Sequence, residues 1–224
     1  MKKTLLLASL CLTLGMAAAW AAPVQGTTNP NAFTQDYIDW CQYGCNVASL
    51  VSPQAWVSHG GATGAVGLNG GFQNFYNLQQ GSSWSGNFPS GTGLIYNGAV
   101  FGNAPTGIMT TFDSGVWGVG AYVQATLYGP FSATISLFDQ NNNFLGSYTA
   151  NGVSDDGSIA TALFIGASGV GPIFAAQFDV IDQLGTEDFA IGQVNMNTTP
   201  EPGTMVLFGT SVLGLAGCLR RRFL

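Results

Sequence analysis

The side chains that carry most enzymatic chemistry are scarce in this sequence. Between residues 22 and 199 there is one histidine, His59, and there is no lysine or arginine. General acid–base and electrophilic catalysis rely on these residue types. The neighbouring carboxylates Asp155 and Asp156 could form a glycosidase pair, but they precede Gly157 in a pattern that favours a turn. We therefore expect a protein that is not an enzyme, with a glycoside hydrolase as the less favoured alternative.

The sequence DQNNN offers weak metal-binding chemistry. Asp139, Asn141 and Asn143 occupy alternate positions, which is the spacing that opens an EF-hand calcium loop. The rest of that loop is missing, because Phe144 and Ala150 stand where its glycine and glutamate belong. A hairpin turn accounts for the same residues without calcium. We expect no cofactor, and we keep these three residues as weak calcium candidates.

Two cysteines, Cys41 and Cys45, lie between residues 22 and 199 in the sequence WCQYGC. Their spacing suits disulfide geometry poorly in an ideal helix, but Gly44 indicates a turn that could bring them together. An oxidising compartment favours the bond, and no further zinc ligands accompany the pair. We predict a small structural disulfide, with two free thiols as the alternative.

Four aromatic residues near Asn, Gln and Asp could stack on sugar rings while polar neighbours bind the hydroxyl groups: Tyr76, Trp84, Tyr96 and Trp117. The alternative is that each lies in the core, because large aromatic side chains dominate the interiors of β-sandwiches. Either way, these rings need a scaffold of strands to hold them.

The sequence predicts such a scaffold over residues 36–197. Residues 132–152 have the pattern of a strand, a polar turn and a returning strand, with Ile135 and Leu137 alternating with polar residues. Further strands are expected in 157–167, 172–180 and 187–196, and hairpin-type pairs occur at 69–70, 97–98 and 151–152. No helical period persists between Gly60 and Pro200. We predict an all-β fold, an antiparallel β-sandwich or jelly roll, preceded by a mobile leader at 22–35.

The distribution of charge limits the partners. Ten of the eleven acidic residues lie between 22 and 199, and all five basic residues lie outside that range. Such a surface cannot neutralise phosphates, so it excludes nucleic acid and anionic lipid as ligands. Hydrophobic residues make up 46% of the chain and aromatic residues 12%, which excludes a disordered acidic tail.

The basic residues are confined to the two ends of the chain. Lys2 and Lys3 precede an apolar run and a small-residue cleavage site at Ala19–Ala21, which is the pattern of a secretory signal peptide over residues 1–21. We expect the Sec export machinery to read it, with a retained N-terminal anchor as the alternative. The apolar run is too short for a permanent membrane span.

The C-terminal end predicts a single transmembrane helix. Residues 203–219 carry no charge and would form a helix about 25 Å long, which tilted or thinned lipid can accommodate. Arg220, Arg221 and Arg222 follow at once, and the positive-inside rule places them in the cytoplasm. The two ends therefore agree on one topology, with residues 22–199 exported.

The order of Pro200-Glu201-Pro202, an apolar helix and an arginine cluster resembles the PEP-CTERM sorting signal of exported bacterial proteins, here over residues 198–224. The resemblance implies recognition and cleavage by exosortase, in a Gram-negative host that makes exopolysaccharide. Residues 36–196 also resemble the β-sandwich domain common among PEP-CTERM proteins, although Gly192 and Gln193 replace the Asp-Asn pair that is frequent in their last strand.

Together these features predict an exported protein that passes through the inner membrane and then resides on the outer cell surface or in the extracellular matrix. Its expected role is structural or adhesive and linked to exopolysaccharide or biofilm. The alternative is a lectin-like carbohydrate-binding module with a defined glycan.

Overall fold

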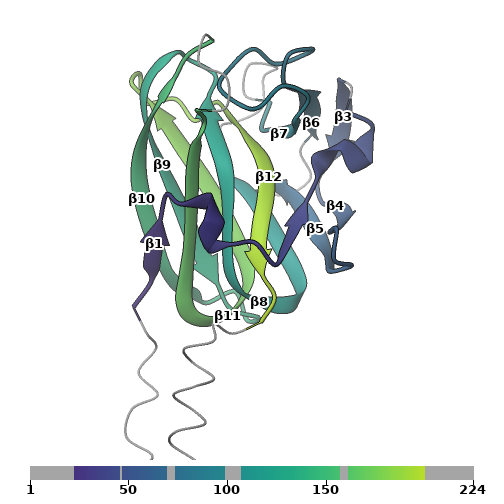
Figure 1. The fold of residues 1–224 in the computed structure, drawn as a ribbon, viewed down its shortest axis with the longest axis vertical. Helices are drawn as coiled ribbons and strands as arrows, with labels where there is room; N and C mark the ends of the chain where they lie inside the picture. The colour runs from purple at the N-terminus through teal and green to yellow at the C-terminus, as the bar shows by residue number, and fades with distance from the viewer. Residues whose placement is uncertain (1–22, 46, 70–73, 99–106, 157–160, 200–224) are drawn as a thin grey trace, which may run out of the picture.

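The computed structural model describes residues 23–45, 47–69, 74–98, 107–156 and 161–199. The expected signal peptide at 1–21 and the sorting motif, helix and basic cluster from Pro200 onward lie outside these residues. The described part is almost entirely β-structure (Figure 1). Its elements are β1 (Gln25–Thr27), η1 (Pro30–Ala32), β2 (Asp36–Ile38), η2 (Trp40–Tyr43), β3 (Ala48–Val51), β4 (Gln54–Val57), β5 (Thr63–Leu68), β6 (Asn74–Gln79), β7 (Gly93–Tyr96), β8 (Ile108–Ala125), β9 (Gly129–Phe138), β10 (Phe144–Ser154), β11 (Leu163–Asp182) and β12 (Phe189–Asn197).

The strands form two antiparallel layers that share the two longest strands, β8 and β11. The first part of β8 pairs with β5 and with the second half of β11, which gives a layer ordered β10-β9-β11-β8-β5-β4. The second part of β8 pairs with β12 and with the first half of β11, which gives a layer ordered β1-β11-β8-β12-β7-β6-β3. The predicted all-β antiparallel architecture is confirmed.

The long strand β11 replaces two strands that the sequence analysis kept separate. Gly169 and Gly171 have φ angles of 88° and 97°, in the left-handed region that glycine adopts readily. The pairing of β11 with β8 shifts register between Ser168 and Ile173, around these glycines. The chain therefore bends from one layer into the other without leaving the sheet.

The core lies between the layers and follows the alternation of each strand. In β9, Phe131, Ala133, Ile135 and Leu137 point inward and are at most 4% exposed. Aromatic side chains from both layers fill the same interior, including Trp40, Trp56 and Phe178, each buried at 1% exposure or less. Burying such side chains is the main stabilising term available to this chain, because no ion pair can form where lysine and arginine are lacking.

The segment that we predicted to be a mobile leader packs on the sandwich instead. Gln25–Thr27 form β1 and pair with β11, and Phe33 is 2% exposed. The Phe33 ring fits against Gly118 and Gly166, where an added methyl group on either glycine would collide with it. The domain boundary at residue 36 was therefore wrong, and the ordered domain begins with β1.

A second correction concerns Asn151–Gly152, which the sequence marked as a hairpin turn. Both residues lie inside β10, paired with Ser132 and Phe131 of β9. The turn of that hairpin is at Asp139–Asn143, where Asn142 adopts a φ of 61°. Gly152 faces the ring of Phe131, so the absence of a side chain lets the ring fill the space.

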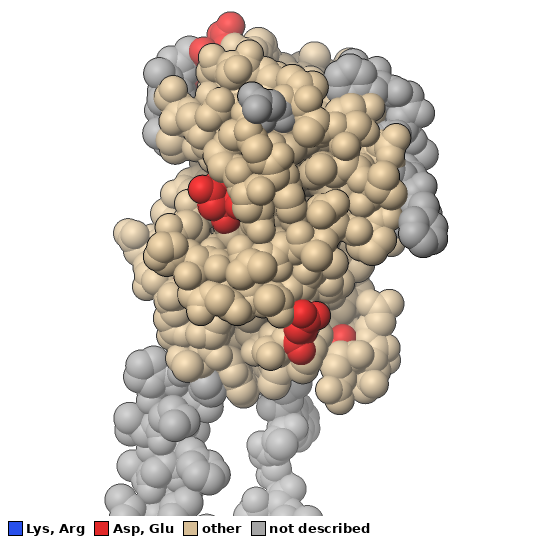
Figure 2. Space-filling view, turned by 90° about the vertical axis from the view of Figure 1, so that its right-hand side faces the viewer, with Lys and Arg blue, Asp and Glu red and all other residues tan. Residues whose placement is uncertain are grey.

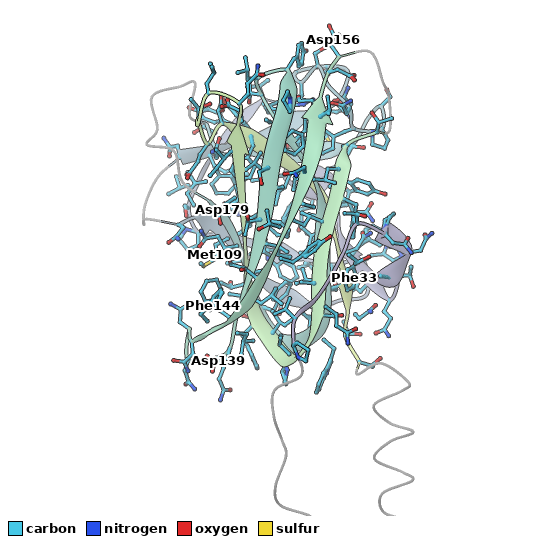
Figure 3. The ribbon with its side chains drawn as sticks, turned by 90° about the vertical axis from the view of Figure 1, so that its left-hand side faces the viewer. Phe33, Met109, Asp139, Phe144, Asp156 and Asp179 are labelled. Atoms are coloured by element: carbon cyan, nitrogen blue, oxygen red, sulfur yellow. A yellow bond between two sulfur atoms is a disulfide. The ribbon has the colours of Figure 1, made fainter. Side chains whose placement is uncertain are left out.

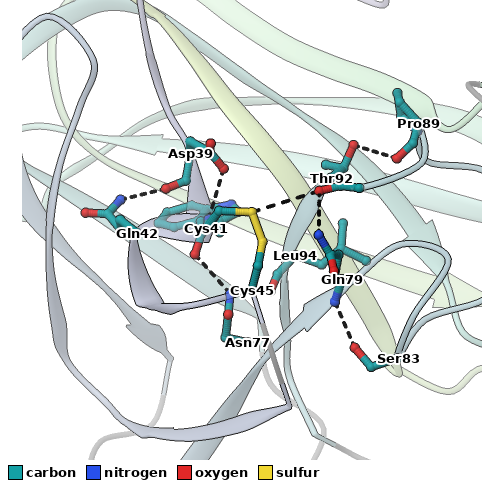
Figure 4. Close-up of a disulfide and its surroundings, with 12 residues drawn as sticks. Asp39, Cys41, Gln42, Cys45, Asn77, Gln79, Ser83, Pro89, Thr92 and Leu94 are labelled. Carbon is teal, nitrogen blue, oxygen red and sulfur yellow. Dashed lines mark hydrogen bonds between the residues drawn. A yellow bond between two sulfur atoms is a disulfide. The ribbon is translucent and has the colours of Figure 1, made fainter.

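The η2 segment holds the only disulfide of the described part of the chain. Cys41 and Cys45 are bonded, with their Cα atoms 4.4 Å apart, and Gly44 between them has a φ of 107° (Figure 4). Asp39 accepts a hydrogen bond from the Cys41 N–H and so caps the start of η2. Trp40 anchors the segment, because its buried indole donates to the Gly192 carbonyl at 2.7 Å.

Candidate functional site

Three of the four candidate sugar-stacking residues come together, but they form a small core rather than an open platform. The Trp84 and Tyr96 rings lie 5.4 Å apart, and the Tyr76 and Tyr96 rings lie 6.3 Å apart. Tyr96 is 2% exposed and belongs to a cluster with Leu78 and Phe88. Tyr96 therefore has no face to offer a ligand, while Tyr76 and Trp84 are half-buried against it.

Trp117, the fourth candidate, lies elsewhere and is half-buried on the outer face of the sheet. Its neighbour in β8, Val116, points into the core opposite Ile173, so the alternation of both strands turns Trp117 and Phe174 outward. The two rings line a surface cavity of about 490 Å³. Gly115, Asp139, Gln140 and Pro172 complete its lining. We call this the Trp117 cavity.

The calcium candidates form the hairpin turn beside this cavity. The Asp139 carboxylate accepts hydrogen bonds from the main-chain N–H groups of Asn141 and Asn143, both at 2.8 Å, and from the Asn143 side chain at 2.9 Å. The bonds from Asn143 lower the pKa of Asp139, so the carboxylate stays ionised at neutral pH. Among all the residues that the structure describes, no group of three or more His, Cys, Asp or Glu residues could hold a metal ion.

The remaining polar candidates have structural contacts. The His59 ring stacks on the Tyr37 ring with centroids 4.9 Å apart, and the main-chain N–H of His59 donates to the Tyr37 carbonyl. Asp155 exchanges two hydrogen bonds with Asn87, its N–H donating at 2.8 Å and its carboxylate accepting at 3.0 Å. Asp155 thus ties the end of β10 to the loop between β6 and β7.

Sequence reasoning missed a second hollow, a groove of about 400 Å³ between η1 and β12. Tyr37 and Tyr122 line it together with Gln193 and Asn195. The Gln193 amide donates to Asn195 at 2.7 Å, so the two amides lie side by side on β12. The period-2 pattern of β12 could have marked both amides as facing outward, but no local signal pointed to the two tyrosines.

The chain leaves the domain next to the Trp117 cavity. Asn197, the last residue of β12, pairs with Gly118, and the main-chain N–H groups of Thr198 and Thr199 donate to Gln35 at 2.9 and 3.0 Å. The sorting residues Pro200, Glu201, Pro202 and Arg220–Arg222 follow, outside the described residues. None of the helices in the described ranges is long and apolar enough to cross a membrane.

Acidic side chains are sparse over the described surface. Figure 2 shows separate red patches of Asp and Glu on a face otherwise made of uncharged residues, and no blue. Residues 22–199 therefore offer an anion no lysine or arginine partner.

Comparison with known proteins places the sorting signal firmly. Residues 198–222 match the family model described as the PEP-CTERM protein-sorting motif, which confirms the resemblance inferred from the sequence. No curated protein matches the chain. The motif match indicates an exported protein that is anchored in the membrane before processing.

Solved structures show weak likenesses. A DUF4465 family protein from Bacteroides caccae is 10% identical, with 78% of this chain and 99% of that chain covered and a TM-score of 0.38. The carbohydrate-binding module CsCBM6-3 from Clostridium stercorarium, in complex with cellobiose, is 16% identical, with coverages of 56% and 95% and a TM-score of 0.28. The module CBM6cm-2 from Cellvibrio mixtus lichenase 5A, in complex with cellotriose, is 11% identical, with coverages of 68% and 98% and a TM-score of 0.24.

Proposed function

We propose that this chain is exported by the Sec machinery, processed by exosortase at its C-terminal motif and delivered to the outer cell surface or the extracellular matrix. There it acts as a non-enzymatic structural or adhesive protein linked to exopolysaccharide or biofilm. The observation that carries the proposal is the match of residues 198–222 to the PEP-CTERM protein-sorting motif. The apolar run 203–219 and the arginines that follow it supply the membrane anchor expected before cleavage.

The sorting step can be tested through the motif itself. Glu201→Ala should leave unprocessed chain in the inner membrane, whereas Glu187→Ala, the same change outside the motif, should be processed normally. Mass spectrometry of the C-terminus of the exported protein measures the outcome. Normal processing of the Glu201→Ala protein would contradict a role for the motif.

The Trp117 cavity favours a second, more specific function, binding of a glycan. Trp117 and Phe174 line it with aromatic rings, the groups that stack on sugars, and Asp139 and Gln140 line it with groups that can bind hydroxyls. Hydrogen bonds within its own turn hold Asp139 in place before any ligand arrives. Because residues 22–199 contain Asp and Glu but no Lys or Arg, we expect the ligand to be a neutral polysaccharide rather than an anionic one.

A glycan array on the mature protein recovered from its host tests this function. Binding of a neutral glycan should be lost in Trp117→Ala and kept in Tyr128→Ala, which removes another exposed aromatic residue. A flat signal across all sugars would remove the lectin-like function and leave the structural role. Polysaccharide cleavage that disappears with one carboxylate substitution would instead establish a hydrolase.

A further inference from the structure

The layer β10-β9-β11-β8-β5-β4 has two edge strands, and the chain covers one of them. β4 pairs only with β5, and its outer side meets η2. The Tyr43 hydroxyl donates to the Ala55 carbonyl at 2.8 Å, and the Val57 N–H donates to the Gln42 side chain at 2.9 Å. These side chains occupy main-chain groups that another strand would need for pairing.

The opposite edge strand, β10, has no partner strand on its outer side among the described residues. It pairs only with β9, and among the described residues no side chain or loop hydrogen-bonds to its main chain. Its eleven residues, FLGSYTANGVS, contain no charge and no proline. Proteins usually block such an edge with charges, proline or a covering segment, so a long uncharged edge is a template for another strand.

The side chains of β10 fit a second copy of the same strand. Phe144 and Val153 are 61% and 60% exposed, and they pair with Phe138 and Pro130 of β9. Those two partners lie four residues on either side of Thr134, which pairs with Thr149. The register of β10 shifts by one residue between Phe144 and Gly146, so a two-fold axis at Thr149 would set Phe144 of one copy beside Val153 of the other. Both apolar side chains would then be buried.

We propose that two copies of this chain associate by antiparallel pairing of their β10 strands about Thr149. The layer then continues from one molecule into the next through main-chain hydrogen bonds, as in strand addition between partners. Ser147 of each copy lies opposite Asn151 of the other, so polar side chains meet polar ones. The contact is isologous, as expected for a dimer with two-fold symmetry.

The pairing fixes how the two molecules are oriented. Both ends of the described domain lie at the Phe144 end of β10. At the N-terminal end, Val24 contacts Gly146. At the C-terminal end, β12 ends opposite Gly118, next to the Trp117 cavity that Asp139 also lines. Figure 3 shows Asp139 and Phe144 at one end of the sandwich and Asp156 at the other. Antiparallel strands therefore point the chain ends of the two copies in opposite directions. Such a pair joins molecules from facing surfaces, or molecules released into a matrix, rather than neighbours anchored in one membrane. This consequence depends on the proposed sorting, whereas the strand pairing does not.

Disulfide trapping in the exported full chain tests the pairing, in a Cys218→Ser background that removes the tail thiol. Ser147 and Asn151 are exposed, so Ser147→Cys and Asn151→Cys should fold. Differently tagged versions of the two variants, mixed under mild oxidation, should form a mixed disulfide, whereas Val57→Cys on the covered β4 edge should not. Cross-linking of Ser147→Cys to itself would overturn the antiparallel register, and equal trapping at Val57 would overturn the choice of edge.

A charge placed on the edge provides the second measurement. Val153→Lys should abolish concentration-dependent association of the mature protein in sedimentation, while Val57→Lys should leave it unchanged, because both valines are similarly exposed, at 60% and 57%. Association that survives Val153→Lys, or a native protein that stays monomeric throughout, would overturn the proposal. Failure here leaves processing of the Glu201→Ala protein unaffected, so the two proposals are tested separately.

Discussion

The two edge strands of the layer β10-β9-β11-β8-β5-β4 differ in how their main chains are hydrogen-bonded. At β4, hydrogen bonds with Tyr43 and Gln42 occupy main-chain groups, whereas among the described residues only β9 hydrogen-bonds to the main chain of β10. Proteins commonly protect an edge with lysine, and this chain has none between residues 22 and 199. Here hydrogen-bonding side chains of η2 cover β4, whereas among the described residues no such side chain covers β10. The comparison teaches that covering depends on a separate segment, η2, which must itself be anchored.

The anchoring of η2 explains why β4 is the covered edge. Trp40 is fully buried and the Cys41–Cys45 disulfide closes the 3-10 turn, so Gln42 and Tyr43 between them are held in place. The Asn77 side chain donates to the Trp40 and Leu94 carbonyls at 3.1 and 3.2 Å, which fixes η2 to the second layer. Among the residues that the structure describes, no comparable hydrogen-bonded segment lies beside β10.

The largest effect is expected from removing the anchor. Trp40→Ala deletes a fully buried side chain and should lower the free energy of unfolding by about 3–5 kcal/mol, the usual cost of a large cavity. It should also release Gln42 and Tyr43 from β4. Urea unfolding of the mature protein measures the first consequence, and trapping at Val57→Cys in the same background measures the second.

Trp117→Ala is the matched control, because Trp117 lies at the surface and should cost far less stability. Trp40→Phe keeps most of the core volume and loses the bond to Gly192. It therefore separates packing from hydrogen bonding if the alanine variant does not fold. If Val57→Cys still forms no intermolecular disulfide in the Trp40→Ala background, η2 is not the segment that covers β4.

A smaller effect is expected at the covering bond itself. Burial raises the pKa of the Tyr43 hydroxyl, so it keeps its proton and donates to Ala55 at all moderate pH values. Tyr43→Phe should lower the free energy of unfolding by about 1 kcal/mol, the typical worth of one such bond. Trapping at Val57→Cys should rise modestly. Tyr128→Phe removes a longer, exposed bond to Ser85 and should leave both measurements unchanged.

Much of this architecture could be predicted from local pattern. The alternation of Ile135 and Leu137 located β9, and the polar run after Phe138 located its turn. The bend in β11 could not be predicted, because glycines that end a strand and glycines that bend one look alike in sequence. The placement of Phe33 was missed for a similar reason, since its pocket is made by Gly118 and Gly166, far along the chain.

The candidate binding residues also differ in whether local sequence could predict their placement. Residue type alone selected Trp117, and the outward phase of β8 is what exposes it. The same reasoning selected Tyr96, whose burial depends on contacts with Trp84 and Tyr76 that no spacing rule contains. The tail needed no tertiary contact to be recognised, because its three parts are contiguous in sequence.

The smallest expected effect is the change of stability with pH. It arises from acidic residues on β11 and at the β9–β10 turn, near the β10 edge. Burial raises the pKa of Asp179 on β11, partly offset by hydrogen bonds from the Gln177 amide, whereas the bonds from Asn143 lower the pKa of Asp139 at the β9–β10 turn. The destabilisation due to Asp179 is present above its raised folded pKa and disappears as pH falls through that value toward 3.8. The stabilisation due to Asp139 is present above 3.8 and is lost as pH falls through its lowered folded pKa.

The melting temperature of the mature protein should therefore rise from neutral to mildly acidic pH and fall again under stronger acid. Asp179→Asn should flatten the rise and leave the fall, and Asp139→Asn should weaken the fall and leave the rise. Burial also raises the pKa values of Glu187 and Asp188, so part of the rise should survive in Asp179→Asn. A rise of undiminished size in that variant would show that Asp179 contributes nothing and would assign the whole effect to the other acids. Sedimentation of the mature protein over the same pH range should show stronger association toward acid, because repulsion between the acidic ends of two copies declines.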